Sequence, residues 1–110
     1  RLQQVFGNLV DNASRMTPEG GTVTITISAE GAESVVRMLD EGPGIADDDI
    51  RHVFDRFYRA QASRDRSTGG AGLGLAIVAA IVRSHGGTVS AARREGRGTV
   101  FTLRLPSIRD

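Results

Sequence analysis

A glycine-rich stretch that leads directly into an apolar segment places the strongest constraint on this chain. Residues 69–75 read Gly-Gly-Ala-Gly-Leu-Gly-Leu, and residues 76–82 are apolar and contain no proline. Glycines at this density let a backbone approach a ligand closely and adopt positive φ. Loop amides and the positive end of a helix together form an anion site, for which phosphate is the usual ligand. The stretch predicts a phosphate-binding loop before a helix, although packing alone also produces glycine-rich turns.

Two common phosphate-binding motifs do not fit this stretch. A P-loop requires Lys after its last glycine, but Leu75 follows Gly74, and all 14 cationic residues of the chain are Arg. A dinucleotide fingerprint that began at Gly70 would need its third glycine at position 75, which is Leu. Any phosphate held here is therefore bound by a different architecture.

Composition limits the class of protein. A length of 110 residues predicts one small domain over residues 1–110, and 39% hydrophobic with 25% charged residues is typical of a soluble globular domain. The net charge of +1 gives no support for nucleic-acid binding, and the absence of Cys excludes disulfides and thiolate metal sites. The longest apolar run, residues 75–82, is too short to span a bilayer. We therefore expect neither a nucleic-acid partner nor direct membrane contact.

The chain opens directly on a helical pattern. Apolar residues at i, i+3, i+4 and i+7 predict an amphipathic helix over residues 1–16, with no capping residue before it, so we interpret the chain as a fragment of a longer protein. Asn8, Asn12 and Arg15 form a polar stripe along one edge of the apolar face. Because Asn is a poor helix former, two of them one turn apart suggest a role beyond solvation, the alternative being a water-facing edge.

Further elements follow from periodicity and turn chemistry. Residues 22–29 alternate between apolar and polar, which predicts a half-buried strand that forms a hairpin with residues 34–39. Three consecutive Asp residues at 47–49 predict the N-cap and first turn of a short helix. The remaining predicted elements are a buried helix over 71–84 with a glycine C-cap and a hairpin of strands 88–93 and 99–105.

Two segments are predicted to lack regular structure. Residues 60–68 are polar and without periodicity, so they are a candidate lid at about residues 60–70, or equally a solvated connection. Residues 107–110 follow Pro106 and are predicted to be a frayed tail.

Asp40 ends the second strand and begins the sequence Asp-Glu-Gly-Pro-Gly. A carboxylate at the end of a core strand is costly to bury without a partner, and the glycines after it would let a flat ligand lie against the backbone. The alternative is an ordinary turn, since Asp, Gly and Pro are the residues that turns use.

Four motifs in order resemble the catalytic domain of sensor histidine kinases. Residues 8–13 (Asn-Leu-Val-Asp-Asn-Ala), 40–44, 54–59 (Phe-Asp-Arg-Phe-Tyr-Arg) and 70–75 are similar to the N, G1, F and G2 boxes of that family, and residues 96–101 also fit. The resemblance covers nearly the whole chain. It implies an α+β fold, a two-layer sandwich shared with gyrase- and MutL-type ATPases, in which about three helices cover a mixed, mostly antiparallel sheet. The family's first edge strand is expected to be missing.

The resemblance also implies ATP and Mg²⁺ as ligands. Asn12 would be the magnesium ligand, Asp40 would accept a hydrogen bond from the adenine amino group, and the catalytic residues would be Asn8, Arg15 and Arg59. An amide oxygen suits Mg²⁺, and a carboxylate suits an exocyclic amine because it only accepts. The full set of nucleotide-binding positions implied is Asn8, Asn12, Arg15, Asp40, Gly42, Gly44, Ile45, Tyr58, Arg59, Gly70, Gly72, Leu73, Gly74, Leu75 and Thr99.

Transfer of phosphate, rather than hydrolysis, is the reaction that the resemblance implies. Hydrolytic relatives carry Glu where this chain has Asn8, and Asn cannot act as a general base. The sequence contains no acceptor-histidine motif, so we expect the acceptor on a separate dimerisation domain of the same protein, a response regulator downstream, and a cytoplasmic domain whose parent is anchored in the membrane. The alternatives are an anti-sigma-type serine kinase, an ATPase of the same fold, or a nucleotide-binding module without catalysis.

Overall fold

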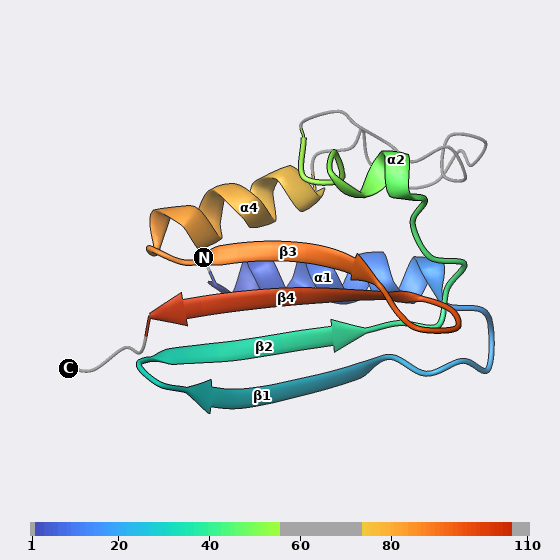
Figure 1. Ribbon diagram of the computed structural model, residues 1–110, viewed down its shortest axis with the longest axis horizontal. Helices are drawn as coiled ribbons and strands as arrows, with labels where there is room; N and C mark the ends of the chain where they lie inside the picture. The colour runs from blue at the N-terminus through green and yellow to red at the C-terminus, as the bar shows by residue number, and fades with distance from the viewer. Residues whose placement is uncertain (1, 56–73, 107–110) are drawn as a thin grey trace.

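The protein has an α+β architecture in which helices cover one face of an open antiparallel sheet. The computed structural model describes residues 2–55 and 74–106. Figure 1 shows the two longer helices together on one side of four strands. In chain order the elements are α1 (Leu2–Met16), β1 (Thr24–Glu30), β2 (Glu33–Leu39), α2 (Asp47–Ile50), α4 (Gly74–Ser84), β3 (Thr88–Arg93) and β4 (Thr99–Pro106).

Two hairpins build the sheet, in the strand order β1-β2-β4-β3. Both predicted hairpins are confirmed, and the central antiparallel pairing of β2 with β4 joins them, with Val36 opposite Leu103. The sheet was expected to be mostly antiparallel, and all three pairings within the described residues are antiparallel.

The core lies between the sheet and the helices α1 and α4. α1 contributes Val5, Leu9 and Ala13 of its predicted apolar stripe, each with 0% exposure, whereas Val10 of the same stripe is 40% exposed. On the helix-facing side of β4, Phe101 and Leu103 are at most 1% exposed and Leu105 is 8% exposed. Burial of side chains of this size stabilises a fold by about 1.5–3 kcal/mol each. No helix within residues 2–55 and 74–106 is both long and apolar enough to cross a membrane.

Helix α4 ends as the sequence predicted. Gly86 has φ +80, and the backbone N–H of Gly87 donates to the carbonyl of Val82 at 2.9 Å. A glycine in the left-handed region satisfies the last carbonyls of a helix and reverses the chain, which here directs it into β3.

The predicted half-burial of the first strand is wrong. Every residue of β1 is exposed, including Ile25 at 49% and Ile27 at 74%. Ile25 and Ile27 lie opposite Met38 and Val36, so the alternation does place them on the helix-facing side of the sheet. However, β1 is at the edge of the described sheet, beyond the strands that the two helices cover, and Val10 of α1 is itself 40% exposed. The alternation of apolar and polar residues determines which side of the sheet a side chain lies on, but not whether another element packs over it.

The short helix α2 also differs from expectation. Asp47, Asp48 and Asp49 occupy its first turn as predicted, but the N-cap is Ala46, with no side-chain hydrogen bond to the helix. Capping by an Asp was therefore wrong, and the acids act through the positive end of the helix instead. The chain then continues in turns, from which Val53 (7% exposed) packs inward.

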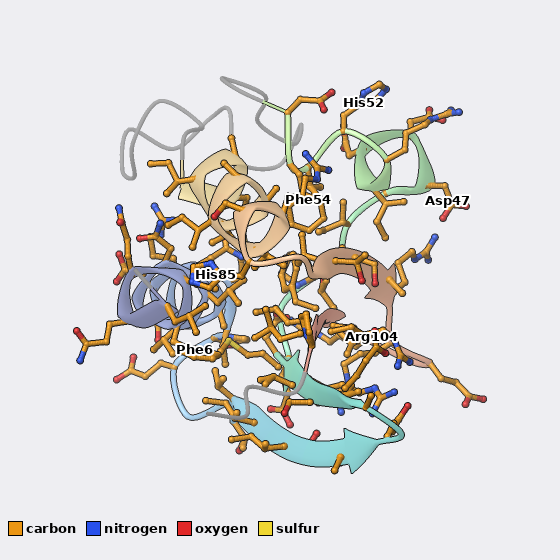
Figure 2. The ribbon with its side chains drawn as sticks, turned by 90° about the vertical axis from the view of Figure 1, so that its left-hand side faces the viewer. Phe6, Asp47, His52, Phe54, His85 and Arg104 are labelled. Carbon is orange, nitrogen blue, oxygen red and sulfur yellow. The ribbon has the colours of Figure 1, made fainter. Side chains whose placement is uncertain are left out.

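The outer face of the sheet carries an ion-pair network. The guanidinium of Arg104 lies 3.1 Å from a carboxylate oxygen of Glu30 and 3.5 Å from one of Glu33, and Arg37 lies 3.6 Å from Glu30. The hydrogen bond that Arg104 donates to Glu30 and the negative charge of Glu30 raise the pKa of Arg104. Figure 2 shows Arg104 on the opposite side of the sheet from Phe6 of α1, so this network lies away from the helices.

Candidate functional site

A buried carboxylate stands at the end of β2. Asp40 is 2% exposed, and its backbone N–H donates to the carbonyl of Thr99 at 3.0 Å. Its side-chain Oδ1 accepts two backbone N–H groups, from Gly42 at 2.9 Å and from Thr99 at 3.3 Å. Backbone donors of this kind offset the cost of burying the carboxylate, which the sequence alone left open. Thr99, also predicted to belong to the site, is 3% exposed.

The second carboxylate oxygen of Asp40 is arranged differently. Both hydrogen bonds use Oδ1, and no described residue donates to Oδ2. No buried side-chain nitrogen or oxygen among the described residues lacks a partner, so Oδ2 keeps contact with solvent. An ionised carboxylate oxygen can only accept. The site therefore offers one fixed acceptor to an incoming N–H or N–H₂ group.

The glycines after Asp40 are required by the protein's own backbone. A Cβ on Gly42 would lie 2.6 Å from the carbonyl oxygen of Met16, at the end of α1. Gly44 has φ +86, and a Cβ there would lie 3.3 Å from the carbonyl oxygen of Gly98. Residues 40–44 thus run between the end of α1 and the turn of the β3–β4 hairpin. Ile45, the next predicted site residue, is half-buried against the core.

The polar stripe of α1 faces the start of α4. The side-chain Nδ2 of Asn8 donates to the carbonyl of Gly74 at 3.2 Å, where α4 begins. Asn12, half-buried, lies one turn further along the same stripe, between Asn8 and the end of the helix at Met16. At 1.5 Å per residue, Asn12 is about 6 Å along the axis from each. The predicted grouping of Asn8, Asn12 and Asp40 around one bound nucleotide stays a prediction, and Arg15 is exposed.

Asn12 is the predicted ligand of a metal ion, and the residues around it set how such an ion could be held. The described residues contain no group of three or more His, Cys, Asp or Glu side chains that could hold a metal ion. A cation beside Asn12 would take an amide oxygen and complete its shell with water and ligand oxygens. Mg²⁺ is bound in this way, since it keeps several waters and prefers oxygen ligands.

Several predicted site residues fall outside the described part of the chain. These are Tyr58, Arg59, Gly70, Gly72 and Leu73, together with the candidate lid at 60–70 and the tail at 107–110. Their roles, including the catalytic role of Arg59, stay predictions. Of the glycine-rich stretch, the structure describes Gly74, which is exposed at the start of α4, and Leu75, which is half-buried and packs against the core.

Residues 1–109 match the sequence profile of the family described as "Histidine kinase-, DNA gyrase B-, and HSP90-like ATPase". The chain belongs to this family. Its fold agrees, because an α+β sandwich with an antiparallel sheet is shared with solved histidine kinase ATPase domains.

Relatives place the chain within one branch of the family. It is 42% identical over 106 residues to "Sensor protein SrrB" of Staphylococcus aureus strain NCTC 8325 / PS 47, covering 96% of this chain and 18% of that protein. Among solved structures, the "Mycobacterial sensor histidine kinase MprB" has a TM-score of 0.85 at 33% identity, covering 94% of this chain and 70% of that one. The relatives are sensor histidine kinases, so this chain is the catalytic ATP-binding domain of a sensor histidine kinase.

A further solved relative was determined with a nucleotide analogue. The structure described as "Crystal structure of ShkA full-length in complex with AMPPNP" has a TM-score of 0.80 at 32% identity, covering 99% of this chain and 22% of that one. The chain thus spans about a fifth of the length of both SrrB and ShkA.

Sequence reasoning missed the residues that hold the Asp40 loop in place. The carboxylate of Glu41 accepts the backbone N–H of Thr22 at 3.0 Å, and the hydroxyl of Thr17 accepts the backbone N–H of Glu41 at 3.4 Å. On the other side, Arg94 and Arg97 donate to carbonyls of the loop. Except for Glu41, these residues are far from Asp40 in sequence, so periodicity carried no signal for them, although Arg97 lies within the motif at residues 96–101.

Proposed function

We propose that this domain binds Mg-ATP and transfers the γ-phosphoryl group to a histidine on a separate phosphoacceptor domain. The observation that carries the proposal is the state of Asp40, whose Oδ1 is held by two backbone amides and whose Oδ2 has no donor among the described residues. The family match and the sensor-kinase relatives support the same reading.

The adenine end of the nucleotide is assigned to Asp40. An exocyclic amino group donates and a carboxylate oxygen accepts, so Oδ2 and the amino group of adenine are complementary. Guanine presents a carbonyl at the same position, which would face the carboxylate with two acceptors and no donor. A site of this kind rejects a base that leaves its buried polar group unpaired.

The phosphate end is assigned to the α1 stripe and the start of α4. The bond from Asn8 to Gly74 holds the two helices together where α4 begins. Asn12 lies between this point and the Asp40 loop, and its amide oxygen would hold the magnesium ion, which when bound neutralises phosphate charge. Arg15 and Arg59 are assigned to the phosphates by resemblance. Helix N-termini bind phosphate through free N–H groups.

Transfer rather than hydrolysis follows from the residue at position 8. Asn8 cannot remove a proton from water, and its Nδ2 is engaged with the carbonyl of Gly74. The domain would therefore hold ATP until an acceptor arrives. The chemistry of phosphoryl transfer depends mainly on positioning and charge neutralisation, which a preformed site supplies.

The test is to titrate ATP with magnesium into the chain and into the variant Asp40→Asn. Asn retains an oxygen for the two backbone amides but places an N–H₂ where Oδ2 stood, so the variant should fold and lose ATP affinity by about 10- to 100-fold, as expected for one lost hydrogen bond to a charged group. The matched control is Asp48→Asn, the same change at an exposed carboxylate of α2, and it should bind as the unaltered chain does.

Transfer is tested separately, by adding the phosphoacceptor domain and following label from γ-labelled ATP. The labelled product should be acid-labile, as a phosphohistidine is. ATP binding that is unaffected by Asp40→Asn, or label that appears on the chain itself with no acceptor present, would contradict the proposal.

The proposal extends to the protein that contains this domain. Sensor-kinase relatives many times its length support a parent that carries a dimerisation and phosphoacceptor domain and passes phosphate to a response regulator. We infer a cytoplasmic position for the domain and a membrane anchor elsewhere in the parent.

A further inference from the structure

The turn of the β3–β4 hairpin lies against the Asp40 loop. Figure 1 shows this turn beside the segment that leaves the C-terminal end of β2. The contact is close, because a Cβ on Gly98 would overlap the carbonyl oxygen of Asp40, and Gly98 itself adopts φ +106. Only glycine allows the two segments to approach to this degree.

Two arginines of the turn donate to the loop. The NH1 group of Arg94 lies 2.7 Å from the carbonyl oxygen of Asp40. The Nε of Arg97 lies 3.3 Å from the carbonyl oxygen of Gly42. Both bonds are partly buried, and the donors are permanently charged, which makes them stronger than bonds between neutral groups.

The carbonyls of Asp40 and Gly42 belong to the two residues whose hydrogen bond orients the Asp40 carboxylate. The backbone N–H of Gly42 donates to Oδ1 of Asp40, so residues 40–42 form a small closed turn. Arg94 holds the first residue of that turn and Arg97 holds the last. The far side of the turn is held by Glu41, through its bonds with Thr17 and Thr22. The direction of Oδ2 therefore depends on contacts from both sides.

We propose that Arg94 and Arg97 are positioning residues that fix the purine-recognising carboxylate and so set the preference for adenine. The inference rests on the proposed function, in which Asp40 Oδ2 accepts from the adenine amino group. Neither arginine needs to touch the nucleotide. Loosening the turn would let Oδ2 move away from the geometry that one hydrogen bond requires, and a displacement of about 1 Å is enough to weaken such recognition.

The experiment compares ATP and GTP, which share ribose and triphosphate and differ in the base. Magnesium-dependent binding of each is measured for the chain, for Arg94→Ala and for Arg97→Ala. We expect each variant to bind ATP about three- to tenfold more weakly and GTP unchanged, because the lost interaction acts through the amino group of adenine. Arg94→Lys should recover most of the ATP affinity, since one N–H donor suffices for the bond to Asp40.

The matched control is Arg93→Ala. Arg93 precedes Arg94 in the chain, and its guanidinium lies 3.1 Å from a carboxylate oxygen of Asp47 in α2 rather than against residues 40–42. It should leave binding of both nucleotides unchanged. Thermal unfolding of each variant without nucleotide separates a loosened turn from a loss of folding.

The outcomes are distinguishable. If the unaltered chain shows no preference for ATP, the proposed function fails and this inference fails with it. If the chain prefers ATP and both alanine variants keep the same ratio of ATP to GTP affinity, only the positioning role is overturned. The role is also overturned if Arg94→Ala and Arg97→Ala weaken both nucleotides equally, or if Arg93→Ala has the same effect as they do.

Discussion

Replacing Gly98 with Ala should destabilise the domain through the contact between the hairpin turn and the end of β2. Gly98 adopts φ +106, and a Cβ there would overlap the carbonyl oxygen of Asp40. The same turn supplies a matched control, because Gly96 adopts φ +90 but a Cβ there meets no atom within 4 Å. Gly96→Ala therefore carries the backbone cost alone, and Gly98→Ala carries the backbone cost and the overlap.

The two costs can be estimated separately. A non-glycine residue at positive φ costs about 1–2 kcal/mol. Overpacking that forces backbone to move costs about 1–3 kcal/mol more. The free energy of unfolding should therefore fall by about 1–2 kcal/mol in Gly96→Ala and by about 2–5 kcal/mol in Gly98→Ala. Both variants gain the same small contribution from a stiffer unfolded chain, which cancels in the comparison.

Urea unfolding measures both values, since the midpoint and slope give the free energy of unfolding in water. The difference between the two variants isolates the contact with Asp40. If that difference is below about 0.5 kcal/mol, the ordinary error of such comparisons, the close approach of the two segments has been misjudged. The positioning role of Arg94 and Arg97 would then lose its structural support as well.

Two further predictions concern the core and the outer face. Leu9→Ala removes a side chain with 0% exposure and should lower the free energy of unfolding by about 2–5 kcal/mol. The control Val10→Ala, one residue along α1 and 40% exposed, should lower it by less than about 1 kcal/mol. Equal losses in denaturant unfolding would refute this assignment of the two side chains to different faces of α1. Arg104→Gln should lower stability at low salt, with the loss shrinking as salt is raised. Glu30 raises the pKa of Arg104, so the ion pair contributes to stability below the ordinary pKa of Arg, and this contribution is lost only as the pH rises through the raised pKa. The free energy of unfolding should therefore show no change from this group between pH 6 and 9.

The local elements followed from the sequence because their causes are local. The helical spacing of Val5, Leu9 and Ala13 predicted both α1 and the face it buries, and glycine chemistry predicted the end of α4 at Gly86. Both hairpins could be predicted for the same reason, since alternation and turn residues lie within a few positions of each other. The four motifs in order, at residues 8–13, 40–44, 54–59 and 70–75, also indicated the family from sequence alone.

The solvent exposure of side chains on β1 depended on the tertiary structure. Ile25 and Ile27 have the alternation of a half-buried strand, yet they are exposed because β1 is at the edge of the described sheet, where neither helix lies over it. An exposed fraction depends on what other segments lie nearby. No pattern of spacing within one strand reports that.

For the candidate site, too, some properties followed from the sequence and others only from the tertiary structure. The sequence alone determined which residues have the right chemistry: a carboxylate at Asp40 with glycines after it, and amides at Asn8 and Asn12. The tertiary structure decided the state of that carboxylate, since amides of Gly42 and Thr99 satisfy one oxygen and the other keeps access to solvent. It also decided that Arg94 holds the loop, from 54 positions away. Hydrogen bonds over such separations form when strands pair, so their partners are fixed by the fold.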